Sequence, residues 1–170
     1  MATPNVLVTY GSKRGGTAEI AEWIGEALRA DGAAADVVPA DSITDVGTYD
    51  AFVIGGALYA MRWHKAARQF VRRHRDTLAG RPVWLFSSGP LDRSAEDRDI
   101  LPVRGVARIA GRIGANGHAT FGGRLTNDPG GRMATAMAKK SAGDYRNRQD
   151  ITAWARSIAE ALQPVKAVES

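Results

Sequence analysis

The chain has 170 residues, a formal net charge of +5 at pH 7, a sequence pI near 9.9 and no cysteine. This length suits one well-filled domain. The lack of cysteine excludes disulfides, thiolate metal sites, iron-sulfur clusters and cysteine nucleophiles, so electron chemistry would need a bound organic cofactor. The basic charge favours an anionic partner, whether a cofactor, a lipid surface or nucleic acid. The histidines His64, His74 and His118 are far apart and lack carboxylates at metal-site spacing, so we expect no metal.

Apolar runs alternate with helical periodicities along the chain, which indicates crossover units and a parallel sheet covered on both faces. Strands are predicted at 5–10, 35–39, 51–57, 82–87 and 118–122. Helices are predicted at 16–31, 63–79, 103–114 and 148–162, with a weaker candidate at 132–142. Gly32, Gly80 and Pro164 stand where helices are expected to stop.

The segment 6–17 reads VLVTYGSKRGGT, an apolar β-branched run that becomes a glycine-rich loop and then opens a helix. Glycines let backbone N–H groups turn inward, and the helix N-terminus presents unpaired amides and a positive dipole end. The loop is neither a Walker A sequence nor the dinucleotide fingerprint GxGxxG, because its glycines are spaced differently. We predict a phosphate-binding loop, with an ordinary glycine-rich turn as the alternative. Its residues are Ser12, Lys13, Arg14, Gly15, Gly16 and Thr17.

Loops after the third, fourth and fifth predicted strands would meet at the same edge of a doubly wound sheet, where ligands bind. Gly55 and Gly56 permit close backbone approach, and Tyr59 or Trp63 could stack on a flat ring. Hydroxyl and amide donors follow the fourth strand and suit a polar ring edge. For each loop alone, a plain surface turn is the alternative. The predicted ring contacts are Ala57, Leu58, Tyr59, Ala60, Met61, Ser87, Ser88, Gly89, Pro90 and Arg124.

The segment 12–17 resembles the flavodoxin phosphate loop, commonly [ST]xTGxT, with Arg14 where Thr is usual. The resemblance extends over 6–21, 49–57, 64–74, 122–125 and 143–147, and covers nearly the whole chain. It is greatest to the flavodoxin-domain branch that includes the menaquinone-dependent protoporphyrinogen oxidase of bacteria. It implies an α/β fold, a flavodoxin-like doubly wound five-stranded parallel sheet in the order 2-1-3-4-5 with helices on both faces. We expect a single domain over 1–164, followed by a tail at 165–170.

The same resemblance implies a non-covalent FMN and electron exchange with a quinone, a nicotinamide donor or a redox protein. Flavodoxin shuttles are acidic and this chain is basic, which favours the oxidase branch. We therefore expect a flavin-dependent oxidoreductase similar to protoporphyrinogen oxidase, in which no side chain serves as acid, base or nucleophile. The alternatives are a non-catalytic electron carrier and a flavin-free basic module that uses the surface at 68–75. The residues leave open the donor, the acceptor, the oligomeric state and the choice between FMN and a deazaflavin.

A cation near the pyrimidine edge of a flavin would raise its reduction potential, and Arg14, Arg62 and Arg124 are the candidates. No run of eighteen apolar residues is present, so we expect a soluble cytoplasmic protein. The mildly apolar segment 130–140 is expected to be a small packing or surface helix, which limits membrane contact to a peripheral one. We expect no nucleic-acid partner.

Overall fold

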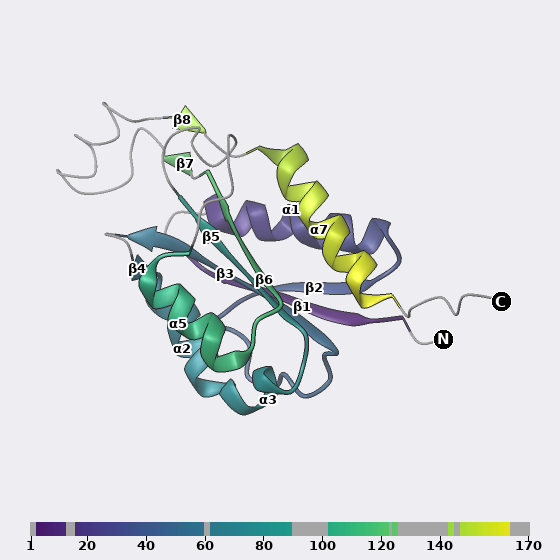
Figure 1. The fold of residues 1–170 in the computed structure, drawn as a ribbon. Coiled ribbons are helices and arrows are strands. Elements are labelled where there is room, and N and C mark those ends of the chain that lie inside the picture. The colour runs from purple at the N-terminus through teal and green to yellow at the C-terminus, as the bar shows by residue number, and fades with distance from the viewer. Residues whose placement is uncertain are drawn as a thin grey trace.

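A computed structural model of the chain describes residues 3–12, 16–59, 62–89, 102–122, 124–125, 143–144 and 147–163. Five parallel strands form its central sheet, in the order β2-β1-β3-β5-β6 (Figure 1). Counted along the chain, these are the predicted five strands in the predicted order 2-1-3-4-5. Their bounds are Asn5–Gly11 (β1), Ala34–Pro39 (β2), Ala51–Tyr59 (β3), Val83–Ser88 (β5) and Gly117–Phe121 (β6).

Helices cover both faces of the sheet, as predicted (Figure 1). One face carries α1 (Gly16–Ala30) and α7 (Arg148–Leu162). The other carries α2 (Lys65–Arg73), α3 (Arg75–Ala79) and α5 (Arg104–Ile113). This two-sided covering explains why the strands read as nearly continuous apolar runs.

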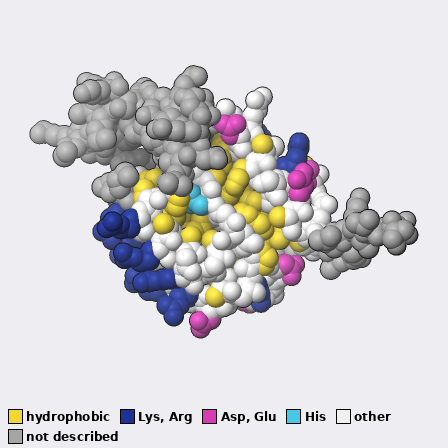
Figure 2. Space-filling model, in the orientation of Figure 1, with side chains coloured by type: hydrophobic (Ala, Val, Ile, Leu, Met, Phe, Trp, Pro, Cys, Tyr) yellow, Lys and Arg dark blue, Asp and Glu magenta, His cyan; other side chains and the backbone are white. Residues whose placement is uncertain are grey.

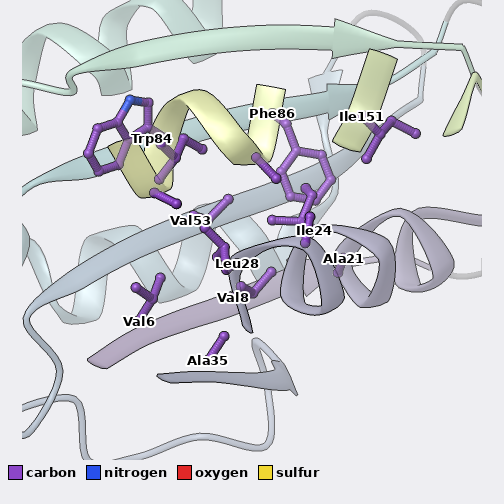
Figure 3. Close-up of a cluster of buried hydrophobic side chains, with 14 of the residues drawn as sticks. Val6, Val8, Ala21, Ile24, Leu28, Ala35, Val53, Trp84, Phe86 and Ile151 are labelled. Carbon is purple, nitrogen blue, oxygen red and sulfur yellow. The ribbon is translucent and has the colours of Figure 1, made fainter. Parts of the chain in front are cut away.

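Side chains alternate across the sheet and fill two separate cores. Val8 and Val53 point toward α1 and α7, whereas Leu7 and Phe52 point toward α2, α3 and α5. Figure 3 shows the first core, in which Val8, Val53 and Phe86 meet helix residues of α1 and α7. All of these strand side chains have no exposed surface, so the sheet is a rigid platform for whatever its edges bind.

The first and last helices of the described chain lie against each other. Ile20, Ile24 and Leu28 recur every fourth residue and place one apolar stripe of α1 in the core. Ile151 and Ile158 of α7 belong to the same cluster. At the rim, Arg148 pairs with Glu26 at 2.8 Å and lies over the Trp23 ring at 5.2 Å from its centroid, and Arg156 pairs with Asp31 at 3.4 Å.

The predicted single helix over 63–79 is wrong. Trp63 pairs with Leu58 in a two-residue strand, β4 (Arg62–Trp63), antiparallel to the end of β3. His64 then starts α2, because its Nδ1 accepts a hydrogen bond from the Ala66 N–H at 3.1 Å. At His74 the backbone leaves helical geometry, with φ −110° and ψ 21°, which separates α2 from α3.

Other sequence predictions shift by a residue or two or fall outside the described residues. The helix candidate at 132–142, the segment 130–140 and the tail at 165–170 lie outside them. Two short strands, β7 (Arg124–Leu125) and β8 (Gly143–Asp144), pair antiparallel and were not predicted. In the described part of the chain, no helix combines the length and apolar character needed to span a bilayer. The domain boundary at 164 stays a prediction.

Candidate site at the carboxyl edge of the sheet

The strand register brings the predicted loops to one edge of the sheet. Gly11, at the end of β1, pairs with Gly56 in β3. One residue further along β3, Ala57 pairs with Ser88, at the end of β5, which in turn pairs with Phe121, at the end of β6. Because all four strands run parallel, the segments that follow them leave the sheet on the same side.

The described part of the predicted phosphate loop joins β1 to the start of α1. Ser12 follows β1 directly and is half-buried, and α1 begins at Gly16. Thr17, in its first turn, is only 2% exposed. Lys13, Arg14 and Gly15 lie outside the described residues. The first turn of α1 therefore faces the same edge as the other loops, with its unpaired amides and positive dipole end.

Gly11 fixes the path of the chain into this loop. A Cβ added at Gly11 would lie 2.7 Å from the Ala67 nitrogen and 2.9 Å from His64 Nδ1. Both atoms belong to the first turn of α2 or its cap, so β1 ends in direct contact with that turn. Glycine is required at this position because no side chain fits between the two elements.

The ring-binding loops meet between β3 and β5. Ala57 is buried, and Leu58 and Tyr59 are half-buried. A Cβ at Gly89 would lie 3.6 Å from the Leu58 Cβ, and Gly89 has φ +132°, a conformation that favours glycine. The Tyr59 ring lies edge-on to His64, with 5.9 Å between centroids. Ala60, Met61 and Pro90 lie outside the described residues.

Gly55 and Gly56 make room for this chain's own aromatic rings. A Cβ at Gly55 would lie 1.9 Å from Phe86 Cζ, and one at Gly56 would lie 2.6 Å from Trp63 Cδ1. Trp63 is 2% exposed, and its Nε1 donates to the Phe86 carbonyl at 3.2 Å. Trp63 is therefore a core residue, which corrects the expectation that it stacks on a ligand ring. The aromatic candidate left at this edge, among the described residues, is Tyr59.

Sequence reasoning missed a hydrogen bond between β5 and β6. Ser87 Oγ lies 3.1 Å from His118 Nε2, and Ser87 is 1% exposed. The other ring nitrogen, Nδ1 of His118, is buried without a hydrogen-bond partner. Burial lowers the pKa of His118 to about 4, so the imidazole is neutral at pH 7. The register places His118 opposite Leu85, a pairing that no local sequence pattern signals.

The two cationic candidates at the ring edge have different standing. Arg124 is a backbone partner of Asp144 in the β7–β8 pair, so 143–144 lie beside 124–125. Its side chain is outside the described set. Arg62 is exposed and pairs through its backbone with Tyr59.

The chemistry of this edge suits an anion beside a flat ring. Ser12 and Thr17 supply hydroxyls, α1 supplies amides, and no carboxylate occurs between residues 11 and 18. Among the described residues, no three His, Asp or Glu side chains gather as a metal site. The donor set therefore fits a phosphate, and Leu58, Tyr59 and Gly89 leave an apolar and aromatic surface next to it.

Comparison with known proteins agrees with this geometry. The model of the flavodoxin domain family matches residues 7–143. The chain is 30% identical over 94 residues to protoporphyrinogen IX dehydrogenase [quinone] of Escherichia coli strain K12. That alignment covers 54% of this chain and 52% of the relative, so the chain spans about half the length of the curated relatives it matches.

Solved structures share the fold at low sequence identity. An archaeal flavodoxin covers 92% of this chain and 97% of its own length, with a TM-score of 0.62 and 14% identity. Oxidised flavodoxin 1 from Bacillus cereus covers 94% and 99%, with a TM-score of 0.63 and 13% identity. Rubredoxin oxygen:oxidoreductase from Desulfovibrio gigas covers 94% of this chain and 37% of its own, with a TM-score of 0.64 and 14% identity.

Proposed function

Because the chain belongs to the flavodoxin-domain family, we propose that it binds FMN at the carboxyl edge of its sheet and works as an oxidoreductase. The observation that carries the proposal is the joint placement of the β1–α1 loop, the end of β3 and the end of β5 on that edge. Ser12 to Thr17 would hold the phosphate. Ala57 to Met61 and Ser87 to Pro90 would flank the ring, and Arg124 would lie near its exposed edge.

FMN supplies one- and two-electron chemistry when bound, so the protein has to bind, orient and tune it. The helix dipole and amides of α1 attract the phosphate, and Thr17 adds a hydroxyl from a buried position. The half-buried Leu58 and Tyr59 offer surface for the ring. A reduced substrate or donor would pass electrons to a quinone or protein acceptor, from a cytoplasmic location with at most peripheral membrane contact.

The similarity to the quinone-linked protoporphyrinogen IX dehydrogenase supports an enzyme over a passive carrier. We propose porphyrinogen oxidation as the reaction to test first. A carrier would exchange electrons with quinone without catalysing porphyrinogen oxidation. Steady-state assays with protoporphyrinogen and a soluble menaquinone analogue separate the two: turnover supports the enzyme, and its absence with a rapidly reoxidised flavin identifies a carrier.

The phosphate loop can be tested by comparing two ligands that differ only in the phosphate. We expect Thr17→Val to weaken FMN binding at least tenfold, because one hydrogen bond to a charged group contributes about 1.5 to 3 kcal/mol. Riboflavin, which lacks the phosphate, should bind wild type and variant equally. Fluorescence quenching of both ligands gives the four dissociation constants.

Thr152→Val, on α7, is the matched control and should leave both affinities unchanged. The phosphate assignment is refuted if Thr17→Val weakens riboflavin as much as FMN, or neither. Mass determination of the cofactor released by heat from purified protein distinguishes FMN from a deazaflavin, and colourless protein that takes up neither supports the flavin-free alternative.

A further inference from the structure

Charge is divided unequally between the two faces of the sheet. Helices α2, α3 and α5 carry eight cationic side chains and one carboxylate, Asp76. Helices α1 and α7, on the opposite face, carry five carboxylates and three arginines. Figure 2 shows a continuous run of Lys and Arg side chains along one side of the molecule. We call the eight cations the basic face: Lys65, Arg68, Arg72, Arg73, Arg75, Arg104, Arg108 and Arg112.

The charge of the basic face is not neutralised within the described part of the chain. The described ion pairs, Arg148–Glu26 and Arg156–Asp31, both involve α7 and the opposite face. Arg68 is tied down by a hydrogen bond from its Nε to the Trp63 carbonyl at 3.0 Å. Its neighbours Arg72 and Arg73 are exposed and form no ion pair with described carboxylates. A concentration of cations of this kind attracts and orients an anionic partner.

Helix α5 organises its share of the charge into a stripe. Arg104, Arg108 and Arg112 follow one another every fourth residue and are all exposed. Such spacing sets them along one side of the helix, about 6 Å apart in axial rise. Val106 and Ile113 are buried on the opposite side, which fixes the stripe toward solvent.

Between these arginines the surface is unusually low. Gly105, Ala107 and Gly111 are exposed, and a Cβ added at either glycine would meet no atom within 4 Å. Nothing inside the described chain therefore requires glycine at these positions. Glycine inside an exposed helix lowers its stability relative to alanine. An external element that approaches the α5 backbone closely would explain both positions, since small residues at a contact bring helix axes nearer.

These features favour one class of anionic partner. The described exposed positions of α2, α3 and α5 include no aromatic side chain, so the basic face lacks the stacking platforms of single-strand nucleic-acid sites. They include no bulky apolar side chain that would insert into a bilayer. Guanidinium groups bind carboxylates in bidentate geometry, and carboxylates every fourth residue on a helix match the spacing on α5.

The stripe starts beside the candidate redox site. Helix α5 ends at Ile113 and β6 begins at Gly117, at the amino edge of the sheet. Because α5 is roughly 15 Å long, Arg104 lies toward the other edge, and α5 there contacts β4. A partner seated on α5 would thus extend to the edge where FMN is proposed.

The geometry points to α5 and the adjoining basic face as the docking surface for an acidic electron-transfer protein that lays a carboxylate-bearing helix along Arg104, Arg108 and Arg112. This inference rests on the proposed function for its redox purpose and on the described charges for its location. It names the acceptor or donor class as a protein. Electron exchange would follow docking, with the flavin as the other redox centre.

Binding of a plant-type [2Fe–2S] ferredoxin, chosen as an acidic electron carrier, tests the surface in the full chain. We expect a dissociation constant that rises steeply with salt. The variant R104Q/R108Q/R112Q should weaken binding at least tenfold. The variant Q149E/A153E/A161E changes the net charge equally on the exposed side of α7 and should change it less than twofold. Circular dichroism and released-flavin content in each sample report folding and cofactor binding separately.

A second variant pair tests close approach of the partner without a change of charge. Gly105→Leu/Gly111→Leu should weaken ferredoxin binding at least tenfold, whereas Gly105→Ala/Gly111→Ala should have a smaller effect. Phosphatidylglycerol vesicles and a 20-base-pair DNA duplex are the competing probes. Failure of ferredoxin to bind, equal loss in the α7 control, or undiminished binding by the leucine variant overturns the inference, whichever other probe binds. Loss of flavin with ferredoxin binding intact would count against the proposed function alone.

Discussion

Replacing Gly55 by alanine lowers the free energy of unfolding by about 3 kcal/mol, at the upper end of typical costs for overfilling a core. The added Cβ would lie 1.9 Å from Phe86 Cζ, a distance that no relaxation short of moving the ring can accommodate. Phe86 has no exposed surface and lies 6.2 Å from both Phe121 and Trp154, measured between ring centroids. The ring therefore has no free space to move into. Urea unfolding followed by tryptophan fluorescence measures the loss.

Two variants check this interpretation. Gly105→Ala, at an open helical position, should raise stability by about 1 kcal/mol, because alanine is the better helix former. Gly55→Ala combined with Phe86→Leu should lose at least about 1 kcal/mol less than the two single changes added, because the shorter side chain removes the clash. Additive losses, or wild-type stability of Gly55→Ala, would show that the Phe86 ring does not fill the space above β3.

Acidification from pH 6.5 to pH 4 is expected to destabilise the protein through His118. Burial lowers the pKa of His118 in the folded protein to about 4, below the model value of 6.5. Between these values the unfolded chain binds more protons than the folded one, so stability rises with pH in this window. The contribution is complete above pH 6.5 and is lost as the pH falls toward 4. We expect about 2 kcal/mol, less than the roughly 3.4 kcal/mol of the full shift, because the residue is only partly buried.

His118→Gln removes the titration while keeping a polar group near Ser87. Urea unfolding of wild type and variant at half-unit pH steps should give curves that converge toward pH 4, since carboxylates contribute to both alike. His74→Gln should show a weaker change of the same sign, because burial and then Arg73 lower the pKa of His74. Parallel wild-type and His118→Gln curves between pH 4 and 6.5 would mean that His118 titrates normally in the folded protein.

The parallel sheet could be predicted from the sequence because each strand is an apolar run between turn residues. β1 and β3 lie within one or two residues of their expected ends, and the strand order followed from the family resemblance. Helix α1 was equally accessible, since Ile20, Ile24 and Leu28 have helical spacing and Gly32 stops the chain after it. These signals are local, so one sequence contains them.

The errors came from contacts between residues distant in sequence. The interruption at His74 and the strand pairing of Trp63 with Leu58 depend on how α2 seats against the sheet, which periodicity does not report. Gly55 and Gly56 were correctly picked out as positions of close approach, but the rings that approach them come from Phe86 and Trp63. The Ser87–His118 hydrogen bond likewise depends on strand register.

The contact between α1 and α7 has a consequence for synthesis of the chain. During translation the apolar stripe of α1 leaves the ribosome more than a hundred residues before Ile151 and Ile158, which cover part of the same core. Contacts between such distant segments form late and leave hydrophobic surface exposed to other chains in the meantime. Nascent chains stalled before residue 148 should therefore depend on chaperones, and this dependence should end once α7 has emerged.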